Sequence, residues 1–507
     1  MIPKLKSATL VGLKPVLVDV EVAELFHDRP MVQIVGLPDT AVREAQQRVF
    51  SAVKSAGLYL PQGKAMVNLA PADVRKEGAL FDLPIALAVA LMAEGQECPA
   101  MPETLFLGEL GLDGSVRPVR GVLSLALLAK QLGMARMVVP DANAQEAVSV
   151  GGLEVYGVSH LNDAWDLVHG ENERLPVQAQ TNHKLDVKPE IDFAEVKGQQ
   201  QVKRALEVAA AGGHNLLMNG PPGTGKSMLA RAYAGILPNL TEGESIEATQ
   251  IHSVLGEHES GLGLMVNRPF AAPHHTISDA GLIGGGTKPM PGQISLAHHG
   301  VLFLDELPEF KRSTLEVLRQ PLEEGKVRIV RAAGAYEFPS RFSLISAMNP
   351  CPCGYHGDPK KVCRCTEKQI AQYKGRISGP LLDRIDLQVN VPRVEFKELN
   401  QEENVENSAQ IKERITQVRA RQRARFEGNE KMGVALTNSN IQSSDLKLYC
   451  PLSPQLEQTV ERIVTKYDLS VRAYVRLMRV ARTIADLAYS ENIEQNHLME
   501  AVRYRSL

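Results

Sequence analysis

A phosphate-binding loop stands near the middle of the chain. Residues 220–227 read GPPGTGKS and fit the pattern G-x-x-x-x-G-K-[ST] at every fixed position. Glycines allow a tight turn with inward backbone N–H groups, the lysine brings positive charge to phosphates, and the hydroxyl offers Mg²⁺ a hard oxygen. A strand expected over 215–219 and a helix over 228–234 argue against an ordinary glycine-rich turn. The predicted nucleotide contacts are Gly220, Pro221, Pro222, Gly223, Thr224, Gly225, Lys226 and Ser227.

Two adjacent acids follow a second apolar segment. Residues 301–304 read VLFL and lead into Asp305 and Glu306. A buried parallel strand has this pattern, and ligands bind at the carboxyl ends of such strands in open α/β sheets. We expect Asp305, with Ser227, to hold Mg²⁺ through water, and Glu306 to orient and polarise an attacking water. Such a short pattern is common by itself, so the prediction depends on the phosphate-binding loop upstream.

Four of the six cysteines crowd into one short segment. Cys351, Cys353, Cys363 and Cys365 form two C-x-C pairs, and paired thiolates on tight turns suit tetrahedral Zn²⁺. In a reducing compartment such clustering favours a metal over disulfides. A structural zinc site is therefore the leading hypothesis, with redox thiols or incidental cysteines as the alternatives.

Two histidine pairs lie between the loop and the cysteines, at 274–275 and 298–299. Adjacent histidines do not easily share one ion, and no ligand spacing typical of a metal site is present. The pattern favours a structural or nucleotide-coupled loop over a metal site.

The composition is that of a water-soluble protein of several domains. The chain has 507 residues, 44% of them hydrophobic and 23% charged, with a net charge of −3. Binding to nucleic acid therefore requires local basic patches. The longest strongly apolar run, residues 83–93, is too short to cross a bilayer, and the N-terminus lacks the pattern of a signal peptide. We expect a cytoplasmic protein without a membrane partner.

The spacing of apolar residues divides the chain into four parts. Strands are expected over 15–22 and 31–35, and helices over 40–56 and 83–94. Alternation about a small-residue turn predicts a β-hairpin over 326–338. The expected organisation is an α+β domain at 1–170, a polar linker at 171–189, a nucleotide-binding α/β module at 190–395 and a mostly helical region at 396–507.

The first domain resembles the protease domain of the Lon family. Residues 76–85 look like the segment that carries the catalytic serine of Lon, and residues 107–123 like the segment that carries its lysine. On this pattern the serine position falls on Leu80 and the lysine position on Leu123, and neither leucine can attack a carbonyl or move a proton. The resemblance implies a Lon-like fold (ribosomal S5 domain 2-like) without the catalytic dyad and without protease activity.

The nucleotide module resembles AAA+ ATPases of the magnesium-chelatase and MCM branch, which implies ATP as the nucleotide. Residues 196–200 match a segment that packs on adenine, although an ordinary helix start also fits. Asn349 falls at sensor 1, an amide that helps to place the hydrolytic water; an Asn-Pro turn is the alternative.

Three arginines match positions that complete AAA+ sites. Arg384 matches an arginine finger that reaches the γ-phosphate of a neighbouring subunit, which would require a ring. The alternative is an ion pair within the chain, with Asp383 or Asp386. Ser470 is expected to cap a C-terminal lid helix, where Arg472 best fits sensor 2 and Arg476 is second.

The hairpin stands just before sensor 1, where MCM-type helicases place a pore hairpin that touches DNA. The available cations are Lys326, Arg328 and Arg331. The helicases carry a lysine beside an Ala-Gly pair, a position that falls near Ala332 here, so the match is loose. A solvated hairpin is the alternative.

Three further segments, residues 268–278, 281–286 and 291–300, closely resemble the YifB/ComM family of magnesium-chelatase-like AAA+ ATPases. The resemblance covers essentially the whole chain. It implies a hexameric ATPase that drives branch migration on single-stranded and branched DNA during natural transformation. A metal-insertion motor and an ATP-driven protein remodeller are the competing interpretations.

Overall fold

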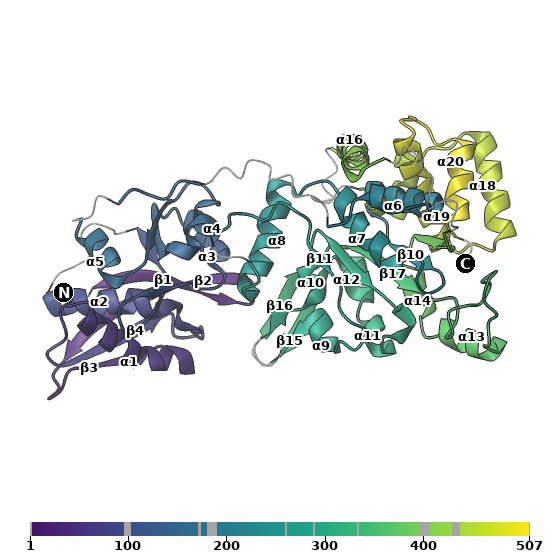
Figure 1. Cartoon of the computed structure of the whole chain (residues 1–507). Coiled ribbons are helices and arrows are strands. Elements are labelled where there is room, and N and C mark those ends of the chain that lie inside the picture. Colours follow the sequence, from purple (N-terminus) through teal and green to yellow (C-terminus); the bar gives the residue numbers. More distant parts are fainter. Residues whose placement is uncertain are drawn as a thin grey trace. The chain divides into compact units, whose positions relative to one another are not determined.

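The computed structural model divides the chain into two compact units, which are coloured along the sequence in Figure 1. Met1–Leu185 and Glu242–Val266 form the N-terminal unit, and Asp186–Thr241 and Asn267–Leu507 form the nucleotide unit. The structure describes residues 3–95, 103–170, 174–179, 190–258, 261–286, 289–331, 334–394, 406–427 and 437–505.

The N-terminal unit is built on a mixed sheet of seven strands in the order β3-β4-β2-β1-β5-β8-β9. The pairs β1–β2 and β2–β4 are antiparallel, and the other neighbours are parallel. The strands are β1 (Lys4–Val11), β2 (Lys14–Leu25), β3 (Met31–Val35), β4 (Lys64–Ala70), β5 (Thr104–Phe106), β8 (Arg136–Pro140) and β9 (Glu154–Val158), with a small ribbon of β6 (Glu109–Leu110) and β7 (Val116–Arg117).

Helices cover both faces of this sheet. Successive side chains of a strand point to opposite faces, and in these strands both faces carry apolar side chains that must be buried. Phe106 and Val138 join one hydrophobic cluster, whereas Leu105 and Met137, their neighbours in sequence, join the other. The helices are α1 (Thr40–Ser55), α2 (Asp82–Glu94), α3 (Val122–Gln131), α4 (Ala144–Val148), α5 (Leu161–His169) and α8 (Glu242–Leu255). The predicted strands and helices of this region are confirmed.

The segment from Glu242 to Val266 belongs to the N-terminal unit although it follows the phosphate-binding loop in sequence. Its helix α8 packs on α3, and the two helices contribute Ile246 and Leu125 to one hydrophobic cluster. The sequence assigned this segment to the 190–395 module, because no local pattern marks a segment that packs on a distant part of the chain.

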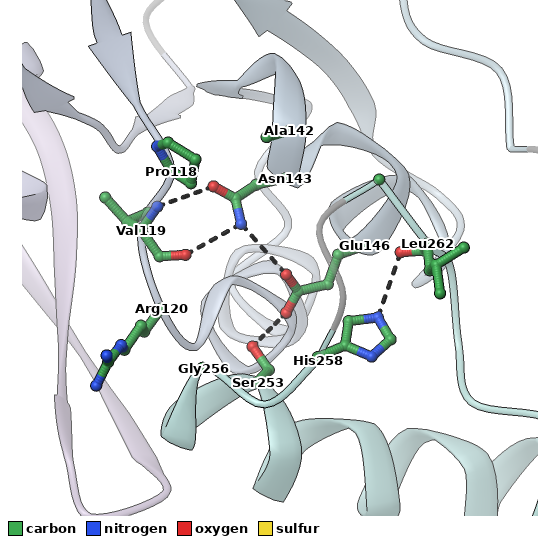
Figure 2. A pocket seen from close by; sticks show the side chains of 11 residues that line it. Pro118, Val119, Arg120, Ala142, Asn143, Glu146, Ser253, Gly256, His258 and Leu262 are labelled. Carbon is green, nitrogen blue, oxygen red and sulfur yellow. Dashed lines mark hydrogen bonds between the residues drawn. The ribbon is translucent and has the colours of Figure 1, made fainter.

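A polar cavity of about 190 Å³ lies inside the N-terminal unit (Figure 2). The Asn143 side chain exchanges two hydrogen bonds of 3.0 Å with the backbone of Val119. The buried Glu146 carboxylate accepts hydrogen bonds from the Ser253 hydroxyl of α8 and from the Leu123 N–H at the start of α3. This network joins α8 to α3 and α4.

The nucleotide unit contains a parallel sheet of five strands in the order β11-β14-β17-β10-β18. These strands are β10 (Leu216–Asn219), β11 (Phe270–Ala271), β14 (Val301–Leu304), β17 (Ser343–Met348) and β18 (Leu387–Asn390). A mixed α/β fold with a parallel sheet is therefore confirmed, as are the predicted strands before the loop and before the two acids.

Helices and two ribbons surround this sheet. The ribbons pair β12 (Gly284–Gly285) with β13 (Met290–Pro291) and β15 (Lys326–Arg331) with β16 (Gly334–Pro339), which confirms the predicted hairpin. The helices before β18 are α6 (Gln200–Gly212), α7 (Lys226–Ile236), α9 (Asp279–Ile283), α10 (Gln293–Leu296), α11 (Arg312–Glu316), α12 (Arg319–Glu324), α13 (Glu367–Lys374) and α14 (Gly379–Leu382).

The described residues after β18 are mostly helical. They form α16 (Ser408–Phe426), α17 (Leu446–Tyr449), α18 (Pro454–Lys466), α19 (Val471–Leu487) and α20 (Gln495–Arg503). Ser470 caps α19 through its side chain, as predicted. Most of the expected linker and the expected boundary at 395/396 lie outside the described residues. Within the described part of the chain, we find no helix that is both long and apolar enough to cross a membrane.

Candidate nucleotide-binding site

The phosphate-binding loop connects β10 to α7 at the carboxyl edge of the parallel sheet. Gly223 and Gly225 have φ angles of 76° and 84°, which strain any residue with a Cβ atom. A Cβ atom at Gly220 would lie 2.3 Å from the backbone oxygen of Val391, so this position has no room for a side chain. The glycines of the motif are thus required by conformation and by packing.

Lys226 and Asn349 are brought together at this edge. The Lys226 ammonium donates to the backbone oxygens of Gly220 at 2.7 Å and Pro221 at 2.9 Å, and to Asn349 Oδ1 at 3.2 Å. Burial lowers the pKa of Lys226, while the charges of Asp305 and Glu306 oppose that shift. The loop lysine therefore contacts the end of β17, where the sensor 1 amide was expected.

Ser227 and Asp305, the two expected Mg²⁺ ligands, contact each other directly. The Ser227 hydroxyl donates to Asp305 Oδ2 at 2.7 Å, across the 78 residues that separate them in sequence. Asp305 Oδ1 accepts the backbone N–H of Glu306, which has a left-handed φ of 52°. Hydroxyl and carboxylate oxygens are the hard ligands that Mg²⁺ prefers, so this pair fits such an ion.

His275 lies beside Glu306, a neighbour that the sequence did not predict. Its Nδ1 is 3.4 Å from Glu306 Oε2, and its ring packs edge-on against Phe310. The sequence marked this segment only as a structural or nucleotide-coupled loop, and the pairing of β11 with the strand that leads to Glu306 brings it to the acid. His275 can orient the Glu306 carboxylate.

A cavity of about 420 Å³ opens beside the loop, a volume typical of small-molecule sites. Its lining includes Val196, Lys197 and Gln199, from the segment expected to pack on adenine, and Glu195 just before that segment. Residues 223–225 and the start of α7 line it as well. Lys360 and Arg393 also line it, and the sequence assigned a role to neither.

Arg384 is held within the chain. Its side chain is 10% exposed, donates to the backbone oxygen of Pro380 at 2.5 Å and pairs with Glu323. An ion pair within the chain, the expected alternative, is therefore present, but its acid is Glu323 rather than Asp383 or Asp386. Asp383 instead binds Arg476 at 3.1 Å, and Asp386 accepts the Asn215 N–H.

The two sensor 2 candidates differ in exposure. Arg472 is exposed on the first turn of α19. Arg476 is buried and donates to the backbone oxygen of Ile385 at 2.9 Å and to Asp383. Among the described residues, Arg384, Arg472 and Arg476 form no hydrogen bond or ion pair with residues 220–227.

The four cysteines converge. Cys351 Sγ lies 3.4 Å from Cys353 Sγ and 3.6 Å from Cys363 Sγ, and all four sulfurs lie within 4.8 Å of one another. A tetrahedron with Zn–S bonds of 2.3 Å has sulfurs about 3.8 Å apart. Backbone N–H groups of Arg364 and Tyr355 lower the pKa of Cys353, whereas burial and the neighbouring sulfurs raise the pKa of Cys363 and Cys365. Opposite shifts of this kind are expected where several thiols crowd into one site. The cluster fits a tetrahedral metal ion.

The hairpin presents its cations to solvent. Lys326, Arg328 and Arg331 are exposed, while Val327 and Ile329 are buried beneath them. Lys326 pairs with Glu337 of the opposite strand at 3.1 Å. Ala332, the position nearest the helicase lysine, lies outside the described residues.

The parallel sheet and the polar groups at its carboxyl edge define a P-loop nucleotide-binding protein. Three protein-family models match the chain in sequence. "Subunit ChlI of Mg-chelatase" matches residues 18–143, "Magnesium chelatase, subunit ChlI" matches 192–399, and "Magnesium chelatase, subunit ChlI C-terminal" matches 405–505.

Similar proteins narrow the class. Competence protein ComM of Haemophilus influenzae is 41% identical over 506 residues, which are 99% of this chain and 97% of that protein. The uncharacterized protein YifB of Escherichia coli is 40% identical over 506 residues, 99% of this chain and 96% of that protein. DNA repair protein RadA of Bacillus subtilis is 28% identical over 162 residues, 31% of this chain and 34% of that protein. The chain belongs to the YifB/ComM family of magnesium-chelatase-like AAA+ proteins.

Proposed function

We propose that this protein hydrolyses ATP and uses the energy to move along DNA. The observation that carries the ATPase proposal is the contact between Ser227 and Asp305, with Glu306 next to it at the same sheet edge. The family supports ATP and Mg²⁺ as cofactors. A bound Mg²⁺ would neutralise charge that develops on the β- and γ-phosphate oxygens.

The chain's own residues divide the work of hydrolysis. The loop N–H groups and Lys226 bind phosphate oxygens, which displace the loop carbonyls from the lysine ammonium. Glu306 orients the attacking water, and Asn349 helps to place it. The oxygen of this water bonds to the γ-phosphorus as the bond between that phosphorus and the leaving ADP breaks. His275 holds the Glu306 carboxylate from the side. In this proposal Arg384 and Arg472 act as arginine finger and sensor 2.

The DNA part of the proposal depends on the hairpin and on the relatives. Exposed cations at 326, 328 and 331 are suited to phosphate contacts that ignore base sequence. One relative is named a competence protein and another a DNA repair protein. We infer a cytoplasmic hexameric ring that acts as a helicase and promotes branch migration on single-stranded and branched DNA during recombination in natural transformation.

The direct experiment measures ATPase activity and strand displacement with single-stranded, duplex and branched DNA. Changing Lys326, Arg328 and Arg331 together to Ala should abolish stimulation by DNA, because three phosphate contacts are lost, and leave basal hydrolysis intact. A matched control changes the exposed cations Lys368, Lys447 and Arg462 to Ala. Unchanged unwinding by the hairpin variant would contradict the assignment of the hairpin.

We further propose a structural zinc at the four cysteines and, at 1–170, a Lon-like domain that lacks protease activity. The latter rests on the placement of its dyad positions, since Leu123 is fully buried and Leu80 packs against the same hydrophobic cluster. Residues 190–241 and 267–395 would be the AAA+ core and 396–507 its lid, since 242–266 belong to the N-terminal unit. The descriptions of the family models support one second candidate, a motor for metal insertion. Hydrolysis that ignores DNA would favour it, and stimulation by unfolded protein would favour a remodeller.

A further inference from the structure

The cysteine loop, residues 351–365, reaches the phosphate-binding loop and the nucleotide cavity. Gly354 has a φ of 83°, and a Cβ atom there would lie 2.6 Å from Pro222 Cδ, so the two loops are in close contact. Lys360, near the middle of the cysteine loop, lines the cavity. The cysteines therefore hold a segment that is part of the site.

The cysteine loop also fixes Arg393, which lines the cavity from beyond the end of β18. Asp358 Oδ2 accepts from Arg393 Nε at 2.6 Å, and Oδ1 accepts the backbone N–H groups of Lys360 at 2.8 Å and Lys361 at 3.0 Å. The Asp358 side chain is fully shielded from solvent. Although burial raises its pKa, these backbone N–H groups and the Arg393 guanidinium hold the pKa of Asp358 below its usual value.

An aromatic ring of the same loop supports this arginine. Arg393 Cζ lies 5.8 Å from the centre of the Tyr355 ring, and Lys361 Nζ lies 4.8 Å from that centre. Both are distances of cation–π contacts. Asp358 and Tyr355 thus position the guanidinium while leaving it 29% exposed.

Gln199, which also lines the cavity, carries a buried acceptor without a hydrogen-bond partner among the described residues. Gln199 is 8% exposed, and its Nε2 donates to the backbone oxygen of Pro392 at 2.6 Å, next to Arg393. Because a backbone oxygen can only accept, the amide atom that faces Pro392 must be the nitrogen, and the other amide atom is therefore Oε1. Oε1 has no hydrogen-bond partner among the described residues. Buried acceptors are normally bonded, so this atom points to a donor group on a ligand, such as the amino group of adenine.

We propose that the cysteine loop forms one wall of the nucleotide site, and that metal bound by its four thiolates positions Arg393 and Lys360 against the base and ribose. This inference rests on the proposed binding of ATP. Residues 220–227 bind the phosphate end, so the two cations contact the nucleoside end. A guanidinium suits this place because its planar face stacks on an aromatic base. Metal binding and nucleotide binding thereby become linked, because both order the same loop.

The experiment measures the Kd of a fluorescent ATP analogue on the full-length protein, with zinc content determined by mass spectrometry. Arg393→Ala should raise the Kd about tenfold, by loss of the stacking guanidinium. Asp358→Asn should raise it by a smaller factor while zinc content stays unchanged. Lys368→Ala, at an exposed cation just beyond the cysteine loop, is the matched control and should leave the Kd unchanged.

Reversible metal removal tests the link without any substitution in the cysteine cluster. Chelation should raise the Kd about as much as Arg393→Ala does, and added zinc should restore it. Chelated Arg393→Ala should show little further loss, because both changes remove the same contact. A circular-dichroism melt of each sample shows whether the fold is retained.

The results distinguish a failure of this inference from a failure of the proposed ATPase function. Lys226→Ala should not bind the ATP analogue and serves as the negative control. If the wild-type protein does not bind it either, the proposed function fails. If the wild type binds and neither Arg393→Ala nor chelation changes the Kd, the inference fails alone. A purified protein without metal that binds ATP with the wild-type Kd also overturns it.

Discussion

The two units each contain a polar cavity, and the buried groups around the two cavities are bonded differently. In the N-terminal unit, Glu146 accepts hydrogen bonds from Leu123, Asn143 and Ser253, and Asn143 is bonded on both sides of its amide. These buried groups satisfy one another, and the bonds they make join α3, α4 and α8. Such a network rigidifies a fold.

The nucleotide site, which comprises this cavity and the neighbouring Lys226, is different because its polar groups are suited to exchange partners. Lys226 rests on two loop carbonyls and on Asn349, and Gln199 keeps an oxygen without a partner among the described residues. Phosphate oxygens are better partners for an ammonium than carbonyls are. At the proposed nucleotide site these groups can therefore exchange their partners for a ligand, whereas the satisfied groups around Glu146 form a structural joint.

The largest effect should come from Arg384, whose guanidinium pairs with Glu323 of its own chain. Arg384→Ala should lower ATP hydrolysis about 10³–10⁵-fold if the guanidinium completes the site of a neighbouring chain. Rates of phosphate release measure this. Glu323→Ala, which removes the partner of Arg384 within the chain, should not cause that loss.

A mixing experiment separates action between chains from action within one. Lys226→Ala and Arg384→Ala proteins are each expected to be inactive alone. Mixed assemblies pair an intact loop with an intact arginine at some interfaces, so mixing should restore part of the hydrolysis. A mixture as inactive as its components would mean that Arg384 serves its own chain.

The second-largest effect should come from Glu306, the residue proposed to polarise the attacking water. Glu306→Gln keeps the size of the side chain and removes the charge that polarises water, so hydrolysis should fall about 10²–10⁴-fold. ATP should still bind, because Lys226 and residues 220–225 are unchanged, and a filter-binding assay of labelled ATP measures this. Normal turnover would place the base elsewhere, and His275→Ala would then show whether its neighbour contributes.

Local patterns predicted what three strands of the nucleotide unit, β10, β14 and β17, present at their ends, whereas β11 and β18 were not predicted. The phosphate-binding loop, Asp305 and Asn349 were recognisable because each follows an apolar run of its own. Their meeting was also predictable, since parallel strands bring their carboxyl ends to one edge. The contact of Ser227 with Asp305 is the result.

Contacts between distant segments could not be predicted in the same way. No spacing announces that His275 lies beside Glu306, or that Asp358 holds Arg393. The place of α8 in the N-terminal unit was missed for the same reason, because its apolar residues do not say which surface they cover. The partner of Arg384 was misjudged because acids close in sequence were considered and Glu323, which lies nearby in space, was not.

The smallest effect should come from the hydrogen-bond network around Glu146, and it should lower the free energy of unfolding without changing ATP hydrolysis. Leu123 and Ser253 both donate to Glu146 Oε1, whereas Asn143 donates to Oε2. In Glu146→Gln, an amide oxygen at the Oε1 position keeps the first two bonds, but its NH₂ group then faces the Asn143 amide donor, and the opposite orientation loses the bonds to Leu123 and Ser253. An unsatisfied buried donor costs about 1–3 kcal/mol, which thermal unfolding of the full chain can measure. Glu103→Gln, at an exposed acid of the same unit, should have no such cost. ATP hydrolysis per folded chain should stay at the wild-type rate, since Glu146 holds α8 and α3 together and has no ligand to bind. A large loss of hydrolysis in this variant, with stability unchanged, would mean that the cavity in Figure 2 is itself a functional site.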